Sequence, residues 1–139
     1  MPAPPEPEGA VRAAFEREAP VATPQECHQV WLDQLPHFAP DPDRVAPMLS
    51  DVVFRPDVHH PRDWGDLHAL EALAAAAIPV LAIGAGRDHA FPIALAERIA
   101  DAAPRGSLVL LEEAGHFPFA DDPEAYWGAV ASWLEATRP

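Results

Sequence analysis

An aspartate and a histidine stand at corresponding places after two strand-like runs of the sequence. Asp88 follows the apolar run at residues 80–83, and His116 follows a similar run at 107–111. Short, β-rich apolar runs are typical of buried parallel strands, whose carboxyl ends form the binding edge of an open sheet. An acid and an imidazole at neighbouring strand ends are the two supporting members of a nucleophile–His–acid triad. The pair therefore predicts proton transfer to and from an attacking nucleophile.

The segment between the two runs predicts the helix that connects them. Pro92 suits the start of a helix, and the apolar residues that follow share one helical face: Leu95, Ala96, Ile99, Ala100 and Ala103. A strand–helix–strand unit joins its parallel strands by a right-handed crossover. We therefore expect an α/β unit that presents Asp88 and His116 at one edge of its sheet.

The motifs around both residues resemble the C-terminal part of the α/β-hydrolase fold. They read GAGRDHAFP at residues 84–92 and GHFP at 115–118. Within that superfamily the sequence is most similar to the proline iminopeptidase-like aminopeptidases, strongly over residues 67–134 and more weakly over 23–67. The resemblance implies two parallel strands with flanking helices, preceded by a helical cap-like segment.

By this resemblance Asp88 is the triad acid and His116 is the triad base. The nucleophile of the family lies in a G-x-S-x-G elbow that precedes the cap in the chain. Ser50, Ser107 and Ser132 all lack that glycine context, so the chain has no nucleophile and is expected to be inactive alone. If a missing N-terminal segment completed the site, the substrate would be a small peptide, amide or ester.

The resemblance also divides the chain into three parts. Residues 1–22 are expected to be a tail that is either disordered or briefly helical, 23–66 a helical cap-like segment, and 67–139 the C-terminal hydrolase core. Cap acids of the family hold the free amino group of the substrate. Glu26 and Asp57 are candidates for that role, although neither lies in a firm motif.

The cap-like segment begins with a strong helix signal. Thr23 and Glu26 have capping-box spacing, and a proline between them suits the first helical turn. The helix is expected to end at Pro36 and to bury Cys27, Val30, Trp31 and Leu35. It is either a cap helix or simply an amphipathic helix. Further along, prolines leave room for one helical turn at residues 44–49, and 51–54 is either a strand or a packed loop.

Two more helices flank the predicted sheet. Asp66 is expected to cap a helix over residues 67–76 that turns Leu67, Leu70, Leu73 and Ala74 inward. Asp122 and Pro123 begin the last helix. Its core-facing stripe comprises Tyr126, Ala129, Val130, Trp133 and Leu134.

Composition excludes several classes of partner. The net charge of −13 disfavours nucleic acid and anionic membranes, which attract basic surfaces. The single cysteine, Cys27, excludes an internal disulfide framework and suits a reducing cytoplasm. The sequence contains no apolar run of about 18 residues and no basic, signal-like N-terminus, so we expect a cytoplasmic protein without a membrane span.

Two binding-site hypotheses are weaker than the triad. Histidines and acids gather at His59, His60, Asp63, Asp66 and His68, but their spacing matches no tight metal-ligand motif, so solvated side chains are expected there. Gly84 and Gly86 follow a strand, but His89 occupies the place of the third glycine of a dinucleotide-binding fingerprint. Neither a metal nor a cofactor is therefore expected.

The alternative to a hydrolase fragment is a non-catalytic remnant that acts as an interaction module. Two strands are too few to form a closed parallel sheet, and the edge of the run at residues 80–83 would lack a partner. That edge could accept a missing N-terminal segment or a second copy of the chain. An upstream coding segment with a G-x-S-x-G elbow would favour the hydrolase fragment.

Overall fold

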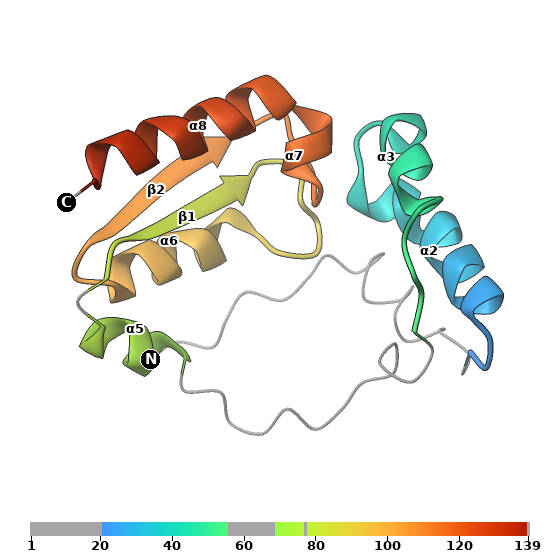
Figure 1. The fold of residues 1–139 in the computed structure, drawn as a ribbon, viewed down its shortest axis with the longest axis horizontal. Coiled ribbons are helices and arrows are strands. Elements are labelled where there is room, and N and C mark those ends of the chain that lie inside the picture. Colours follow the sequence, from blue (N-terminus) through green and yellow to red (C-terminus); the bar gives the residue numbers. More distant parts are fainter. Residues whose placement is uncertain (1–20, 56–68, 77, 139) are drawn as a thin grey trace.

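The computed structural model describes residues 21–55, 69–76 and 78–138. Its elements are α2 (Pro24–Phe38), α3 (Pro42–Leu49), α5 (Ala69–Ala75), β1 (Val80–Ala85), α6 (Ile93–Ala102), β2 (Gly106–Leu111), α7 (Pro118–Asp121) and α8 (Pro123–Ala136). The sheet and its helices form one side of the molecule and α2 with α3 the other, while α7 lies between them (Figure 1).

The two strands form the parallel pair that the sequence predicts. They pair in register from Val80 with Gly106 to Ala85 with Leu111. Helix α6 covers one face and α8 the other (Figure 1). Strand β1 extends two residues beyond the predicted run, because Gly84 and Ala85 still pair with β2. A Cβ at Gly84 would lie 3.2 Å from the Cβ of Ala96, so the glycine lets α6 pack closely on the sheet.

Helix α2 begins as predicted but ends later. The Thr23 side chain accepts from the Glu26 N–H while the Glu26 carboxylate accepts from the Thr23 N–H, which completes a capping box. The expected end at Pro36 is wrong, because the helix continues to Phe38. Proline removes only one hydrogen bond so near a helix end, and the extension buries Phe38 to 3 % exposure.

Helices α2, α3 and α7 enclose a second apolar core. Its buried members are Leu35, Ala39, Val45, Leu49 and Ala120. Helix α3 spans eight residues rather than the single turn that we expected, because Pro42 lies in its first turn, where a proline N–H is not needed. Residues 52–55 have no regular secondary structure, and Phe54 packs against this core, so the packed loop is the correct alternative.

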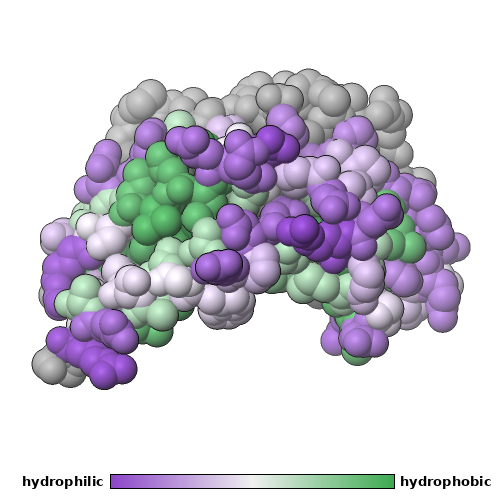
Figure 2. Space-filling view, turned by 90° about the horizontal axis from the view of Figure 1, so that it is seen from above, coloured by the Kyte–Doolittle hydropathy of each residue, from purple (hydrophilic) through white to green (hydrophobic). Residues whose placement is uncertain are grey.

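The outer surfaces of the sheet unit are incompletely covered. Leu134 is 52 % exposed, and α8 has no fully buried residue, so the predicted core-facing stripe is only partly buried. Ala74 is also exposed rather than turned inward. The described sheet has only two strands, and of these α8 packs mainly against β2, so part of its apolar stripe faces solvent. Figure 2 shows an apolar patch on this half of the molecule, where Leu108 and Leu110 are also exposed.

Several expectations fall outside the described residues. These are the tail at residues 1–20, the Asp66 cap, the candidate cap acid Asp57 and the histidine-rich group around His59 and His60. Among the residues that are described, no helix is both long enough and apolar enough to cross a membrane.

Candidate active site

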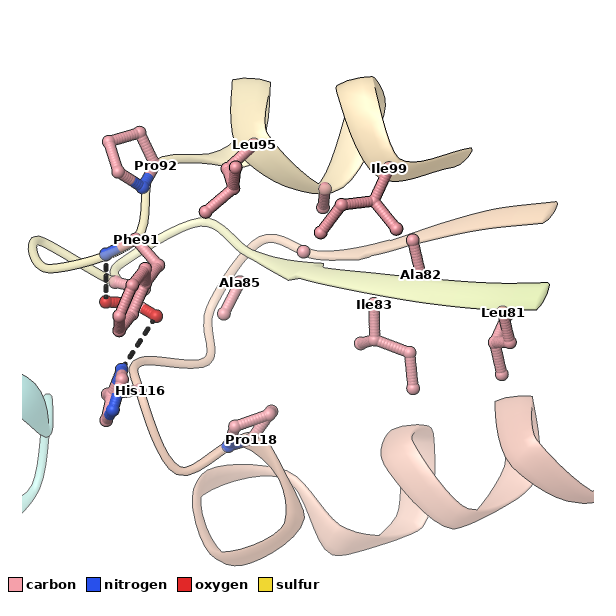
Figure 3. A pocket seen from close by; sticks show the side chains of 13 residues that line it. Leu81, Ala82, Ile83, Ala85, Phe91, Pro92, Leu95, Ile99, His116 and Pro118 are labelled. Carbon is pink, nitrogen blue, oxygen red and sulfur yellow. Dashed lines mark hydrogen bonds and ion pairs between the residues drawn. The ribbon is translucent and has the colours of Figure 1, made fainter. Parts of the chain in front are cut away.

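Asp88 lies in the turn that follows β1, and its carboxylate organises that turn. Oδ1 accepts the backbone N–H groups of Ala90 and Phe91, both at 2.9 Å. Oδ2 lies 3.0 Å from Nδ1 of His116 (Figure 3). The side chain is only 10 % exposed. One oxygen thus fixes the loop, and the other is free to hold the imidazole.

His116 lies in the loop after β2, within hydrogen-bond reach of Asp88 as the strand order predicts. A carboxylate can only accept, so Nδ1 of His116 carries the proton and Nε2 is left as the basic nitrogen. The histidine side chain is 23 % exposed. Its backbone N–H donates to the carbonyl of Phe38 at 2.8 Å. The preceding Gly115 N–H donates to Oδ2 of Asp121 at 2.8 Å.

Backbone hydrogen bonds tie the two strand-end loops together. The Gly86 N–H donates to the Leu111 carbonyl and the Arg87 N–H to the Ala114 carbonyl, both at 2.9 Å. Exposed side chains of Arg87 and Glu113 also form an ion pair between the loops. The distance between acid and histidine therefore depends on backbone contacts as well as on their own hydrogen bond.

The electrostatics of Asp88 favour its ionised form. Burial by itself would raise the pKa of this carboxyl. The hydrogen bond from His116, the backbone N–H groups of Phe91 and Ala90, and the electrostatic attraction of the His116 side chain together outweigh burial and lower the pKa below its usual value. Asp88 is therefore a carboxylate near neutral pH, as the supporting acid of a triad must be.

The pKa of Asp121 is shifted in the opposite direction to that of Asp88. Burial raises the pKa of its carboxyl, although the Gly115 N–H and the charge of Arg44 act to lower it. Arg44 on α3 donates to the Asp121 backbone carbonyl at 2.6 Å. Oδ1 of Asp121 is buried without a hydrogen-bond partner among the described residues. Asp121 thus supports the histidine loop through Oδ2, while its Oδ1 lacks a hydrogen bond.

Three phenyl rings surround the imidazole of His116. Phe91 stacks on it at a centroid distance of 5.2 Å and an interplanar angle of 19°, while Phe38 and Phe117 also lie at 5.2 Å, tilted and edge-on respectively. Sequence reasoning did not identify these rings as part of the site. Phe91 and Phe117 belong to the two motifs themselves, which could have identified them. Phe38 belongs to a distant helix and gives none.

A groove of about 380 Å³ runs from the acid–histidine pair along β1. Five consecutive strand residues, 81–85, line it together with Leu95, Ala96 and Ile99 of α6. Figure 3 shows Ala82 directed toward α6, whereas Leu81 and Ile83 point to the opposite face. Successive residues of a strand face opposite sides, so a groove lined by all of them follows the strand's open edge.

None of the serines is placed to attack a substrate beside His116. The Ser50 hydroxyl donates to the Pro47 carbonyl at the end of α3. Ser107 lies at the start of β2, at the end opposite to the histidine, and Ser132 lies on the last helix. The sequence lacks a G-x-S-x-G elbow, and none of the described serines takes its place beside His116.

The other candidate residues are not brought to the pair. The Glu26 carboxylate accepts the backbone N–H groups of Ala22 and Thr23, which lower its pKa and engage it in capping α2. His89 is exposed beside Asp88. In the described part of the chain, no group of three or more histidine, cysteine or acidic side chains could hold a metal.

Comparisons with known proteins agree with this geometry at the level of the fold. No family model matches the chain. Over 63 residues the chain is 36% identical to uncharacterised proteins of Mycobacterium bovis and Mycobacterium tuberculosis, a match that covers 45% of this chain and 18% of theirs.

Solved structures match over nearly the whole chain. A thermophilic esterase from Thermogutta terrifontis has a TM-score of 0.62 at 18% identity, covering 94% of this chain and 52% of the esterase. A Mycobacterium tuberculosis protein named as a candidate non-heme bromoperoxidase has a TM-score of 0.61 at 20% identity, covering 96% and 55%. The chain therefore has the fold of a C-terminal α/β-hydrolase portion and spans about half the length of the structures it matches.

Proposed function

We propose that this chain supplies the acid and the base of an α/β-fold serine hydrolase and lacks the nucleophile. The observation that carries the proposal is the 3.0 Å contact between Nδ1 of His116 and Oδ2 of Asp88, at the ends of adjacent parallel strands. In this role Asp88 keeps the imidazole in one tautomer and stabilises it when it becomes cationic. Nε2 of His116 takes the proton of an attacking serine and later gives it to the leaving group.

The serine must come from a second segment of polypeptide. The groove along β1 supports this part of the proposal, because it follows a strand edge that is unpaired among the described residues and begins beside His116. The chain spans only 52% to 55% of the solved structures that it matches. A segment with a strand and a G-x-S-x-G elbow would extend the sheet and bring the nucleophile to the same edge.

The substrate is inferred from the resemblance to proline iminopeptidases. We place the reaction at the peptide or amide bond that follows an N-terminal residue, on the strength of the motifs at residues 84–92 and 115–118. An ester is the second substrate class, because the same proton transfers serve both reactions. No residue of the chain is assigned to hold the substrate's amino group.

Labelling with a fluorophosphonate and turnover of a proline arylamide test this proposal. The chain alone should show neither, because a triad without its nucleophile loses activity on the order of a millionfold. Addition of an elbow-bearing N-terminal segment, in trans or by fusion, should produce both labelling and turnover. Labelling of the lone chain at Ser50 would overturn the assignment of a missing nucleophile.

Substitutions in the completed protein then test the two roles. His116→Ala should abolish turnover, and Asp88→Asn should reduce it by about 10⁴-fold because the tautomer is no longer held. His89→Ala is the matched control, since this exposed histidine adjoins Asp88 and has no part in the proposed proton transfer, and it should leave turnover unchanged. Turnover that is indifferent to His116 would contradict the proposal.

The unpaired edge of β1 favours one alternative function. A strand edge with free N–H and C=O groups is a template for another chain, so the protein could act as an interaction module without catalysis. Sequencing of the DNA upstream of the first codon separates the two functions. A G-x-S-x-G segment there, in frame or shifted, would favour the hydrolase; its absence would favour the interaction module.

A further inference from the structure

One buried side chain outside the strand-end loops contacts both of them. The carbonyl of Phe38, the last residue of α2, accepts the His116 N–H at 2.8 Å, and the two ring centroids lie 5.2 Å apart. Phe38 is 3 % exposed and packs with Ala90 and Phe117. Ala90 belongs to the Asp88 loop, and Phe117 follows the histidine. Phe38 is thus in contact with residues that adjoin both Asp88 and His116.

Gly115 shows how closely the end of α2 approaches the histidine loop. A Cβ at this position would lie 2.5 Å from the Phe38 carbonyl oxygen and 2.6 Å from Cδ of Pro40. Real Cβ atoms do not approach other heavy atoms so closely, so any side chain here would push α2 and the loop apart. The position therefore requires glycine because of a backbone from a distant part of the sequence.

The aromatic contacts restrict the imidazole as the backbone contact restricts the loop. The ring of Phe91 stacks on His116 at 19°, and the ring of Phe38 lies at 42° to it. A hydrogen bond weakens steeply when its donor turns away from the acceptor. The contact between Nδ1 and Asp88 therefore depends on the rings that limit rotation of the imidazole, as well as on the two partners themselves.

We propose that Phe38 is a positioning residue for His116, acting through its carbonyl on the loop and through its ring on the imidazole. The inference rests on the proposed function, in which His116 is the base. It assigns the segment of α2 and α3 to the construction of the site rather than only to its cover. Phe38 touches no reacting atom, and its effect is transmitted through the orientation of His116.

The hydrogen-bonded Nδ1 proton of His116 provides a direct measurement. In NMR spectra of the full chain, a proton shared between imidazole and carboxylate gives a signal far downfield of the amide region. Gly115→Ala should remove this signal, and Phe38→Leu, which keeps the carbonyl and an apolar side chain, should weaken it and speed its exchange with water. In the completed enzyme both changes should lower kcat and leave KM nearly unchanged, since a misplacement of about 1 Å can cost 10²-fold in rate.

Leu35→Ala is the matched control. Leu35 is a buried residue of the same helix, 2 % exposed, and belongs to the core with Val45 and Leu49. Of the three rings around His116, only that of Phe117 packs against this core. This change should destabilise α2 and yet leave the downfield signal in the folded protein. A signal that Leu35→Ala removes as completely as Gly115→Ala does would overturn the positioning role, because general loosening would then explain both.

The remaining outcomes also decide the proposal. An unaltered signal in folded Gly115→Ala or Phe38→Leu protein would overturn it, and so would the lack of the signal in the unaltered chain. If Gly115→Ala does not fold, Phe38→Leu alone decides. Spectra that behave as expected in a chain that never becomes active on completion would refute the proposed hydrolase function while leaving the positioning of His116 intact.

Discussion

Gly86 is the residue at which the geometry of the acid loop can be tested most directly. A Cβ at this position would lie 2.2 Å from the Glu112 carbonyl oxygen and 2.7 Å from the Glu112 Cα. Ordinary carbon contacts are about 3.5–4.0 Å. Because the obstructing atoms are backbone, no side-chain rotation can relieve the overlap. Gly86→Ala must therefore push the two strand-end loops apart.

The energetic loss follows from the bonds that would be strained. Separation of the loops weakens the hydrogen bonds from Gly86 to Leu111 and from Arg87 to Ala114, both 2.9 Å long. Their net worth is about 1–3 kcal/mol together, and overpacking typically costs a further 1–3 kcal/mol. We expect Gly86→Ala to lower the free energy of unfolding by at least about 2 kcal/mol, a large share of the 5–15 kcal/mol typical of a domain.

The same glycine-to-alanine change at Gly128 should raise the free energy of unfolding rather than lower it. Gly128 is exposed on α8, and a Cβ there would meet no atom within 4 Å. Alanine is favoured over glycine by about 1 kcal/mol in a helix interior. Urea unfolding followed by tryptophan fluorescence measures both variants against the unaltered chain. Gly86→Ala protein as stable as the parent, or equal losses at both positions, would refute the reasoning.

Three further predictions concern the sheet edge and the two partly buried acids Asp88 and Asp121. Sedimentation should show the isolated chain as oligomers or aggregates, because no strand in the described part of the chain pairs with the outer edge of β1. A monomer with cooperative unfolding at high temperature would contradict this. Because the pKa of Asp88 is lowered, its stabilising contribution is complete above its unfolded pKa of about 3.9 and is lost as pH falls through the folded pKa. Asp88→Asn should therefore make the urea midpoint fall less steeply as the pH is lowered, and an unchanged dependence on pH would count against the assignment. The pKa of Asp121 is raised, so this carboxyl destabilises the fold as pH rises through its folded pKa. Asp121→Asn keeps an acceptor for the Gly115 N–H, so it should be at least as stable as the parent at pH 7 and lose that advantage below about pH 4. A large loss of stability at pH 7 would show that the charge itself is needed.

Local signals in the sequence were sufficient for the elements around the pair. Thr23 and Glu26 predicted a capping box because its atoms lie within one helical turn. The apolar runs and the helix between them predicted a parallel pair, since a single crossover helix leaves little choice of topology. The positions of Asp88 and His116 after these strands were enough to predict their proximity.

Features that depend on distant packing could not be predicted in the same way. Pro36 is a local signal for a helix end, but burial of Phe38 extends α2 past it. Leu134 has the spacing of a core residue and is nevertheless half exposed, because the described sheet is too narrow to cover its helix. The approach of the Phe38 carbonyl to His116 joins segments 78 positions apart, and no periodicity or motif encodes such a contact.

The Asp88–His116 pair is organised by contacts within this one chain. Asp88 has hydrogen-bond partners at both carboxylate oxygens, the loops are joined by backbone bonds, and His116 lies among three phenyl rings. Binding is tighter when one partner needs little reordering. Under the proposed function, a nucleophile-bearing segment would therefore lose free energy mainly in ordering its own strand and elbow, because it would meet an imidazole whose tautomer is already fixed. The sheet, by contrast, is incomplete among the described residues, because one strand edge and several apolar side chains are exposed. Burial of this surface would provide the favourable free energy for association with the proposed segment.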